Sequence, residues 1–281
     1  MTSPQLVGTW SIVFMCATLL LSIGVPVALA IWAKLRYRKA FSFVPLLLGA
    51  AAFFLFQLVI RITALQLLSQ LAWFVDFATN YQWIYIALLA FTAGLFEEPP
   101  RFLVYSILKK RRSFVDGLSY GIGHGGIESV MLVGMSYISN LTMAFMINTG
   151  TIDTLLQATP ESARGALQAG VTALTTTGSD LFLAAGVERV FTVFVQIALS
   201  LLVMRGFQTG QKWLYLALAI AVHTAIDFVA VALQKVGLSP WALEGVIAGF
   251  GILSLLYIVG LARRYAREQP KAETELYSQQ A

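Results

Sequence analysis

Long apolar runs separated by short polar connections fill most of the chain. Seven of these runs are long enough to cross a bilayer as a helix, which requires about 20 residues. None shows the alternating ten-residue segments of an outer-membrane barrel. The pattern therefore predicts an all-α fold, a polytopic bundle of about seven transmembrane helices, with spans at roughly 6–33, 42–64, 82–108, 114–147, 180–204, 213–234 and 240–262.

The composition agrees with this pattern, since 58% of the 281 residues are hydrophobic and only 12% are charged. Soluble domains carry about 25% charged residues, so a water-soluble globular protein is excluded. We expect a single integral-membrane domain over residues 1–262, followed by a polar cytoplasmic tail at 263–281. The expected location is a bacterial-type cell membrane, with the lipid bilayer around the helices.

The basic residues predict the orientation of the bundle. Alternate crossings place the connections 34–41, 109–113 and 205–212 and the tail on one side, with 14 of the 19 basic residues. The positive-inside bias makes that side cytoplasmic, so the N-terminus and the long polar connection 149–179 are expected outside. Basic clusters between apolar runs are typical of membrane loops, and we expect no nucleic-acid partner.

Nine ionisable residues lie inside four of the predicted spans. Each is costly near the bilayer centre unless it is paired or faces water, so such residues mark function by default. They are Glu97, Glu98 and Arg101 in the third span, His124 and Glu128 in the fourth, Glu188 and Arg189 in the fifth, and His223 and Asp227 in the sixth.

The only two histidines each precede a carboxylate by four residues, as His124/Glu128 and His223/Asp227. That spacing puts an imidazole and a carboxylate on one helix face. Such groups suit zinc and similar divalent ions, so two helices together could enclose one ion. The alternative is that each carboxylate only holds its own histidine in a packed bundle.

The third span contains Glu97-Glu98-Pro99-Pro100-Arg101. The prolines cannot donate to the carbonyls one turn earlier, so we expect the helix to break or kink there. A new helix would start at the prolines, placing both carboxylates near its positive end, with Arg101 as their local partner.

Other polar residues and four glycines are also candidates for a role in packing or in the site. Glu188 is a candidate metal ligand or a supporting group, and Arg189 is expected to be a structural counter-ion. Arg61 is expected to reach the membrane interface. Four glycines around His124 indicate either tight helix packing or room for a substrate; they are Gly121, Gly123, Gly125 and Gly126.

Together, Glu97-Glu98-Pro-Pro-Arg101, Gly-His124-Gly-Gly-Ile-Glu128 and His223-xxx-Asp227 resemble the YhfC-type intramembrane metalloproteases, relatives of the PrsW and CAAX proteases. The resemblance covers about half of the chain. It implies a membrane hydrolase in which Glu97 activates water, Glu98 and Arg101 organise the site, and groups of the other two motifs bind metal or stabilise the oxyanion. Two residues separate Glu98 from Arg101, as in PrsW, whereas CAAX enzymes have three.

We therefore expect an intramembrane peptidase that acts on a membrane protein or peptide. Catalytic candidates are Glu97, Glu98 and Arg101. Candidate ligands for a divalent metal, with zinc preferred, are His124, Glu128, His223, Asp227 and Glu188. An ion-coupled transporter or a noncatalytic membrane scaffold are the alternatives, because carboxylates and histidines at the midplane also occur in transporters.

Overall fold

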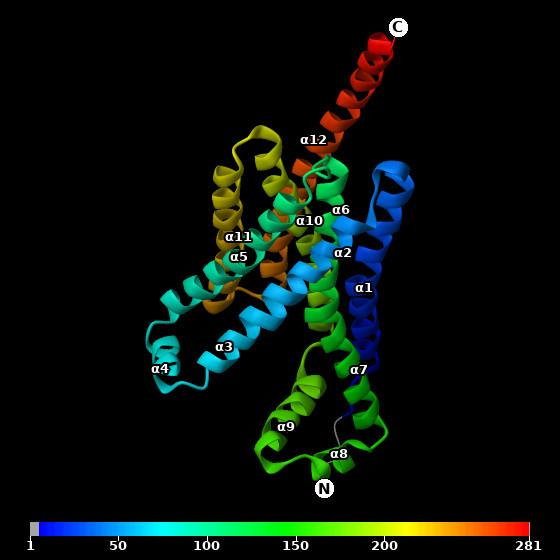
Figure 1. The fold of residues 1–281 in the computed structure, drawn as a ribbon. Helices are drawn as coiled ribbons and strands as arrows, with labels where there is room; N and C mark the ends of the chain where they lie inside the picture. The colour runs from blue at the N-terminus through cyan, green and yellow to red at the C-terminus, as the bar shows by residue number, and fades with distance from the viewer. Residues whose placement is uncertain (1–5, 281) are drawn as a thin grey trace. The chain divides into compact units, whose positions relative to one another are not determined.

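A computed structural model describes the backbone of residues 6–280 and the side chains of residues 6–268. Every regular element in that part of the chain is helical, and the ribbon is drawn in Figure 1. The segment η1 is a 3₁₀ turn, whereas η2 and η3 are π-helical stretches inside longer helices. The elements are α1 (Thr9–Tyr37), η1 (Arg38–Ala40), α2 (Phe43–Ala52), η2 (Phe53–Ile62), α3 (Thr63–Leu68), α4 (Ala72–Asn80), α5 (Gln82–Ile107), α6 (Phe114–Ser129), η3 (Val130–Gly134), α7 (Met135–Asn148), α8 (Ile152–Ala158), α9 (Glu161–Thr176), α10 (Ser179–Thr209), α11 (Lys212–Lys235) and α12 (Pro240–Gln280).

Six helical runs within the described residues are long and apolar enough to cross a membrane. The prediction of a polytopic helical membrane protein is confirmed. The remaining predicted span, 82–108, forms the 26-residue helix α5, which is not among these six runs. The number of crossings and the orientation remain predictions. The six runs are Thr9–Ala40, Phe43–Leu68, Phe114–Asn148, Ser179–Thr209, Lys212–Lys235 and Pro240–Glu268.

The chain divides into two compact units, and three long helical runs contribute to both. The smaller unit contains the residues up to Val25 and Ser129–Val190. Its apolar core gathers residues of α1, α7 and the start of α10, among them Met15 and Phe182. The backbone carbonyl of Phe182 accepts hydrogen bonds from Thr18 Oγ1 at 2.6 Å and from Tyr137 Oη at 2.8 Å. The predicted polar connection after α7 is not a loop throughout, because α8 and α9 form within it.

The larger unit contains Pro26–Glu128 and the chain from Phe191 onward, with two apolar core clusters. Within it α5 packs along α11, as the ribbon shows (Figure 1). Gly94 permits this approach, since a Cβ there would lie 3.0 Å from Thr224 Oγ1 and 3.1 Å from the carbonyl oxygen of Ile220. The close contact brings the glutamates of α5 to the histidine of α11.

The structure contradicts the predicted break at Pro99 and Pro100, whereas the alternative of a kink stays a prediction. The helix α5 continues through both prolines to Ile107 without interruption. Prolines are tolerated inside membrane helices because neighbouring helices can compensate for the lost backbone hydrogen bonds. Here Pro100 is buried in the packed unit, so tertiary contacts outweigh the local preference of the two prolines. The glutamates therefore lie on a continuous helix and not at a new helix N-terminus.

Candidate active site

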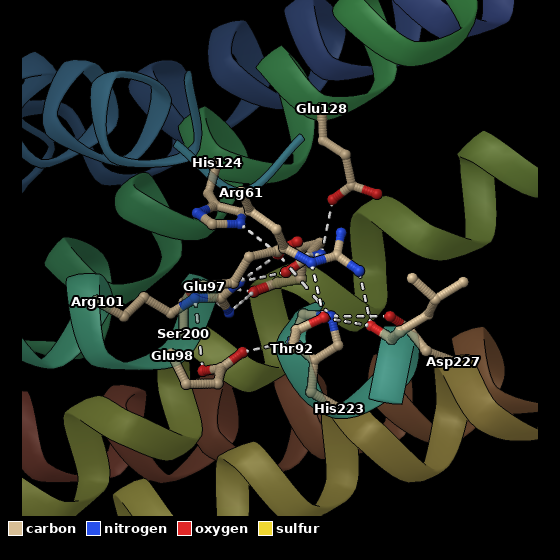
Figure 2. Close-up of polar contacts among 12 residues, drawn as sticks. Arg61, Thr92, Glu97, Glu98, Arg101, His124, Glu128, Ser200, His223 and Asp227 are labelled. Carbon is tan, nitrogen blue, oxygen red and sulfur yellow. Dashed lines mark hydrogen bonds and ion pairs between the residues drawn. The ribbon is translucent and has the colours of Figure 1, made fainter. Parts of the chain in front are cut away.

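A buried polar cluster lies inside the larger unit, between α5, α6, α10 and α11 (Figure 2). Seven of the eight predicted site residues meet there, from three separate sequence motifs. They are Glu97, Glu98, Arg101, His124, Glu128, His223 and Asp227.

Glu97 occupies the centre of the cluster, and its side chain is 4% exposed. The Oε2 atom is 2.9 Å from His124 Nε2 and accepts a hydrogen bond from Gln196 Nε2 at 3.1 Å. The same oxygen lies 3.7 Å from a guanidinium nitrogen of Arg101 and 3.8 Å from His223 Nε2. One carboxylate oxygen of α5 thus links groups from three other parts of the unit.

Glu98 supports the second histidine. Its Oε1 lies 2.8 Å from His223 Nδ1, and both side chains are buried. The Nε2 atom of His223 faces the opposite way, 3.7 Å from Asp227 Oδ2 and 3.8 Å from Glu97 Oε2. A carboxylate at Nδ1 can hold a proton there, and Nε2, which lies between two other carboxylates, would offer its lone pair to a metal ion once it is deprotonated.

Arg101 is fully buried and contacts both glutamates, as the sequence indicated. Its Nε atom lies 3.6 Å from Glu98 Oε2. The guanidinium also donates to the backbone carbonyl of Gln196 at 3.0 Å and to Ser200 Oγ at 3.2 Å. A buried arginine between two carboxylates offsets their mutual repulsion, and these hydrogen bonds fix its orientation.

Gln196 on α10 is a site residue that sequence reasoning missed. Its Nε2 donates both to Glu97 and, at 2.7 Å, to Glu128 Oε2, while its Oε1 accepts from Arg101. Gln196 therefore connects Glu97 of the first motif with Glu128 of the second through hydrogen bonds. The available signal was a lone amide four residues before Ser200 in an apolar span, but an uncharged side chain carries a smaller insertion cost and draws less attention.

The glycines of α6 serve tight packing. A Cβ at Gly123 would collide with the backbone of Leu46 on α2, and one at Gly125 would lie 2.9 Å from Gln196 Cβ. A Cβ at Gly121 would lie 2.6 Å from Ile197 Cα. Neighbouring helices thus fill the space beside these three glycines, which favours the packing interpretation.

The ring of Phe53 lies edge-on to the ring of His124, with centroids 5.2 Å apart.

Arg61 turns toward α5 and the buried cluster, which argues against the predicted extension to the membrane interface. Its Nε donates to Thr92 Oγ1 at 3.1 Å and one terminal nitrogen donates to the carbonyl of Leu89 at 2.7 Å. Both partners lie on α5, and Figure 2 shows the guanidinium at the cluster. Hydrogen-bonded partners inside the bundle make snorkelling unnecessary, because a paired arginine can remain at membrane depth.

Glu188 belongs to the smaller unit, where its carboxylate is hydrogen-bonded to the guanidinium of Arg189. Its side chain is 29% exposed. The pairing agrees with the expected counter-ion role of Arg189. Metal binding by Glu188 remains a prediction.

A group of three residues, Glu97, His124 and Glu128, has ligand atoms within 4.8 Å of one another and could hold a metal ion.

The two histidines differ in how well they suit metal binding. Nδ1 of His124 is buried and has no hydrogen-bond partner among the described residues. Metal binding through Nε2 would put a proton on that buried Nδ1, whereas metal-bound histidines normally donate this proton to an acceptor. His223 has such an acceptor in Glu98.

Comparisons with known proteins agree with the three motifs. A family model described as YhfC intramembrane metalloprotease matches residues 19–248. The chain is also 30% identical over 261 residues to the uncharacterized membrane protein YhfC of Bacillus subtilis (strain 168), covering 92% of this chain and 99% of that protein. No solved structure matches the chain.

Proposed function

Because the chain belongs to the YhfC intramembrane metalloprotease family, we propose that Glu97 activates a water molecule for hydrolysis of a peptide bond within or beside the membrane. The central observation is the position of its Oε2 atom, which meets His124, Gln196, Arg101 and His223 in a buried cluster. A buried carboxylate surrounded by donors at membrane depth is costly to maintain without a function.

In the proposed reaction Glu97 is the general base. It accepts a proton from water as the water oxygen bonds to the carbonyl carbon of the substrate. The same carboxyl then gives this proton to the amine nitrogen as the carbon–nitrogen bond breaks. The second proton of the water stays on the new carboxyl group, so the products are one carboxylic acid and one amine, and Glu97 returns to its starting state.

The surrounding side chains position Glu97. His124 and Gln196 donate to one of its oxygens, so the carboxylate cannot rotate freely. Arg101 balances the charge of the neighbouring carboxylates, at 3.7 Å from Glu97 and 3.6 Å from Glu98. These contacts hold the base in one orientation before substrate arrives, which lowers the cost of reaching the transition state.

The donor set fits a divalent ion, with zinc as our preferred metal. The proposed ligands are His223, through the Nε2 atom that Glu98 leaves available, and Asp227 beside it. Glu128 would be the third ligand, and His124, whose ligand atom lies within 4.8 Å of that of Glu128, is the competing imidazole. A bound ion would polarise the substrate carbonyl and lower the pKa of a bound water. In this arrangement Glu97 is a base and not a permanent ligand.

The test compares Glu97→Gln with the wild-type protein. Membranes from cells that express either form are searched for new peptide N-termini, and a peptide found this way is then cleaved in proteoliposomes. We expect Glu97→Gln to fold, to retain its metal and to lose cleavage by about 10²- to 10⁴-fold, the usual contribution of a general base. Glu244→Gln is the matched control, since it removes another buried carboxylate, on α12.

Four results would count against the proposal. Full cleavage by Glu97→Gln would exclude it as the base. Loss of the metal in that variant would make it a ligand. Ion flux that requires Glu97, without cleavage, in wild-type proteoliposomes would identify the chain as a transporter. Absence of both ion flux and cleavage would favour a noncatalytic scaffold.

A further inference from the structure

The larger unit contains a cavity that lies away from the residues of the buried cluster. It has a volume of about 840 Å³ and lies between α1, α10 and α12, with α6 contributing to its wall. Its wall includes buried apolar side chains of a core cluster, which are Phe114, Leu118, Ile197 and Ile258. The cavity is thus a preformed apolar groove along membrane-spanning helices.

Two arginines stand at one end of this groove. Arg36 lies four residues before the end of the first spanning run, and Arg263 lies five residues before the end of the last. Both side chains are exposed, and the sixteen residues that line the groove include no carboxylate. Among the side chains that the structure describes, none forms an ion pair with either arginine. The groove therefore combines apolar walls with a positively charged end.

Aromatic rings surround the charged end. The ring of Tyr37 is 6.1 Å from that of Trp32, 6.0 Å from that of Phe114 and 6.2 Å from that of Tyr265, and the Arg36 guanidinium lies 5.4 Å from it. Tryptophan and tyrosine concentrate at the level of lipid headgroups, because their rings are apolar and their polar atoms prefer water. A group of rings of this kind beside the two arginines is what headgroup depth favours.

We propose that this groove binds an anionic phospholipid, with the headgroup phosphate between Arg36 and Arg263 and an acyl chain along the apolar wall. From Arg263 the wall extends to Leu255, eight residues or about 12 Å along the helix. Basic pockets between membrane helices are suited to anionic headgroups, whose charge attracts arginine over short distances. A free phosphate ion would leave most of this apolar wall unused, so the lipid is the favoured ligand.

Tryptophan quenching tests the proposal, because Trp32 lines the groove. The full-length protein is placed in nanodiscs with dibrominated phosphatidylglycerol or dibrominated phosphatidylcholine at equal mole fractions. The fluorescence of Trp32 is obtained by subtracting the fluorescence of the Trp32→Phe counterpart from that of each protein. We expect phosphatidylglycerol to be preferred at this position on the order of tenfold, since two basic residues contribute to the attraction.

The double variant Arg36→Gln/Arg263→Gln should lose that preference. The matched control Lys39→Gln/Arg264→Gln removes the same charge near the same helix ends, but neither residue lines the groove, and Arg264 is paired with Glu268 at 2.7 Å. Equal quenching by the two lipids in the wild type would overturn the proposal. So would an equal loss of preference in the control, which would reveal general surface attraction. Arg36→Gln alone provides a milder change if the double variant does not fold.

Discussion

The helices α6 and α11 carry the same sequence pattern, a histidine followed four residues later by a carboxylate, yet the structure gives them different surroundings. On α6, His124 contacts Glu97 through Nε2, and its Nδ1 has no hydrogen-bond partner among the described residues. On α11, His223 contacts Glu98 through Nδ1 and turns Nε2 toward Asp227 and Glu97. Identical spacing thus gives the two histidines different partners, and under the proposed function His124 donates a hydrogen bond whereas His223 binds the ion.

The difference originates in α5, which packs against both sides of the cluster. Its two adjacent glutamates point in different directions, because neighbouring residues on a helix are about 100° apart. Glu97 meets the α6 histidine and Glu98 meets the α11 histidine. Each histidine therefore contacts one carboxylate of the double glutamate. The two histidines differ in which ring nitrogen makes that contact, Nε2 in His124 and Nδ1 in His223.

Replacing each histidine by glutamine gives the most direct test of this difference and the largest expected effect. A glutamine amide can still donate to Glu97 in place of His124, but it cannot provide the imidazole lone pair of His223. We expect His223→Gln to lose the metal and at least about 100-fold in cleavage, and His124→Gln to keep the metal and most of the cleavage. Metal analysis by mass spectrometry and the cleavage assay measure both. Equal loss of metal in the two variants would show that the histidines are equivalent ligands.

Arg101 tests the charge balance between the two glutamates. Arg101→Met leaves both carboxylates buried without their cation, and we expect the unfolding free energy to fall by about 3–5 kcal/mol. A second change, Glu98→Gln, should restore more stability than Glu97→Gln in the same background. The reason is that Glu98 Oε2 has no hydrogen-bond donor among the described residues, whereas Glu97 Oε2 has two.

Circular dichroism during unfolding in mixed micelles follows these Arg101 variants. Their common reference is Arg111→Met, which removes an exposed arginine from a looser pair, 3.8 Å from Asp116. A larger rescue by Glu97→Gln would contradict this expectation and show that Arg101 balances the charge of Glu97 more than that of Glu98.

Gln196→Leu should weaken the α6 side of the cluster while leaving the α11 side in place. The amide donates to Glu97 and Glu128, and neither donor survives in leucine. We expect cleavage to fall by about 10- to 100-fold, the usual effect of losing a supporting group around a metal site. Metal held by His223 should remain. The control is Gln208→Leu, also on α10, whose amide donates to the Arg112 carbonyl at 2.8 Å outside the cluster; it should retain full cleavage.

The smallest effect is expected for the double substitution Pro99→Ala/Pro100→Ala. The helix already continues through both positions, so alanine adds two backbone donors without moving Glu97 or Glu98. Thermal unfolding should occur at the same or a higher temperature, and cleavage should change by less than about threefold, as for a substitution that leaves the backbone in place. Loss of cleavage together with retained stability would show that the prolines shape the site after all.

The sequence determined the features that depend on local composition. Apolar runs predicted the helices to within a few residues, as for 82–108 against Gln82–Ile107 and 114–147 against Phe114–Asn148. The cost of ionisable groups in a membrane pointed to the residues that now meet in one cluster. The motifs also indicated the family, which the comparisons confirmed.

Only the tertiary structure decided which groups are partners. The spacing of His124 and Glu128 indicated a pair, but Gln196 of α10 reaches Glu128, and Glu97 of α5 reaches His124. The same holds for Arg61, which finds acceptors on α5, and for the prolines, whose local preference yields to packing. Helix periodicity fixes only which face a side chain occupies. Which helix lies opposite that face depends on contacts between residues far apart in the chain, such as the approach of α11 at Gly94.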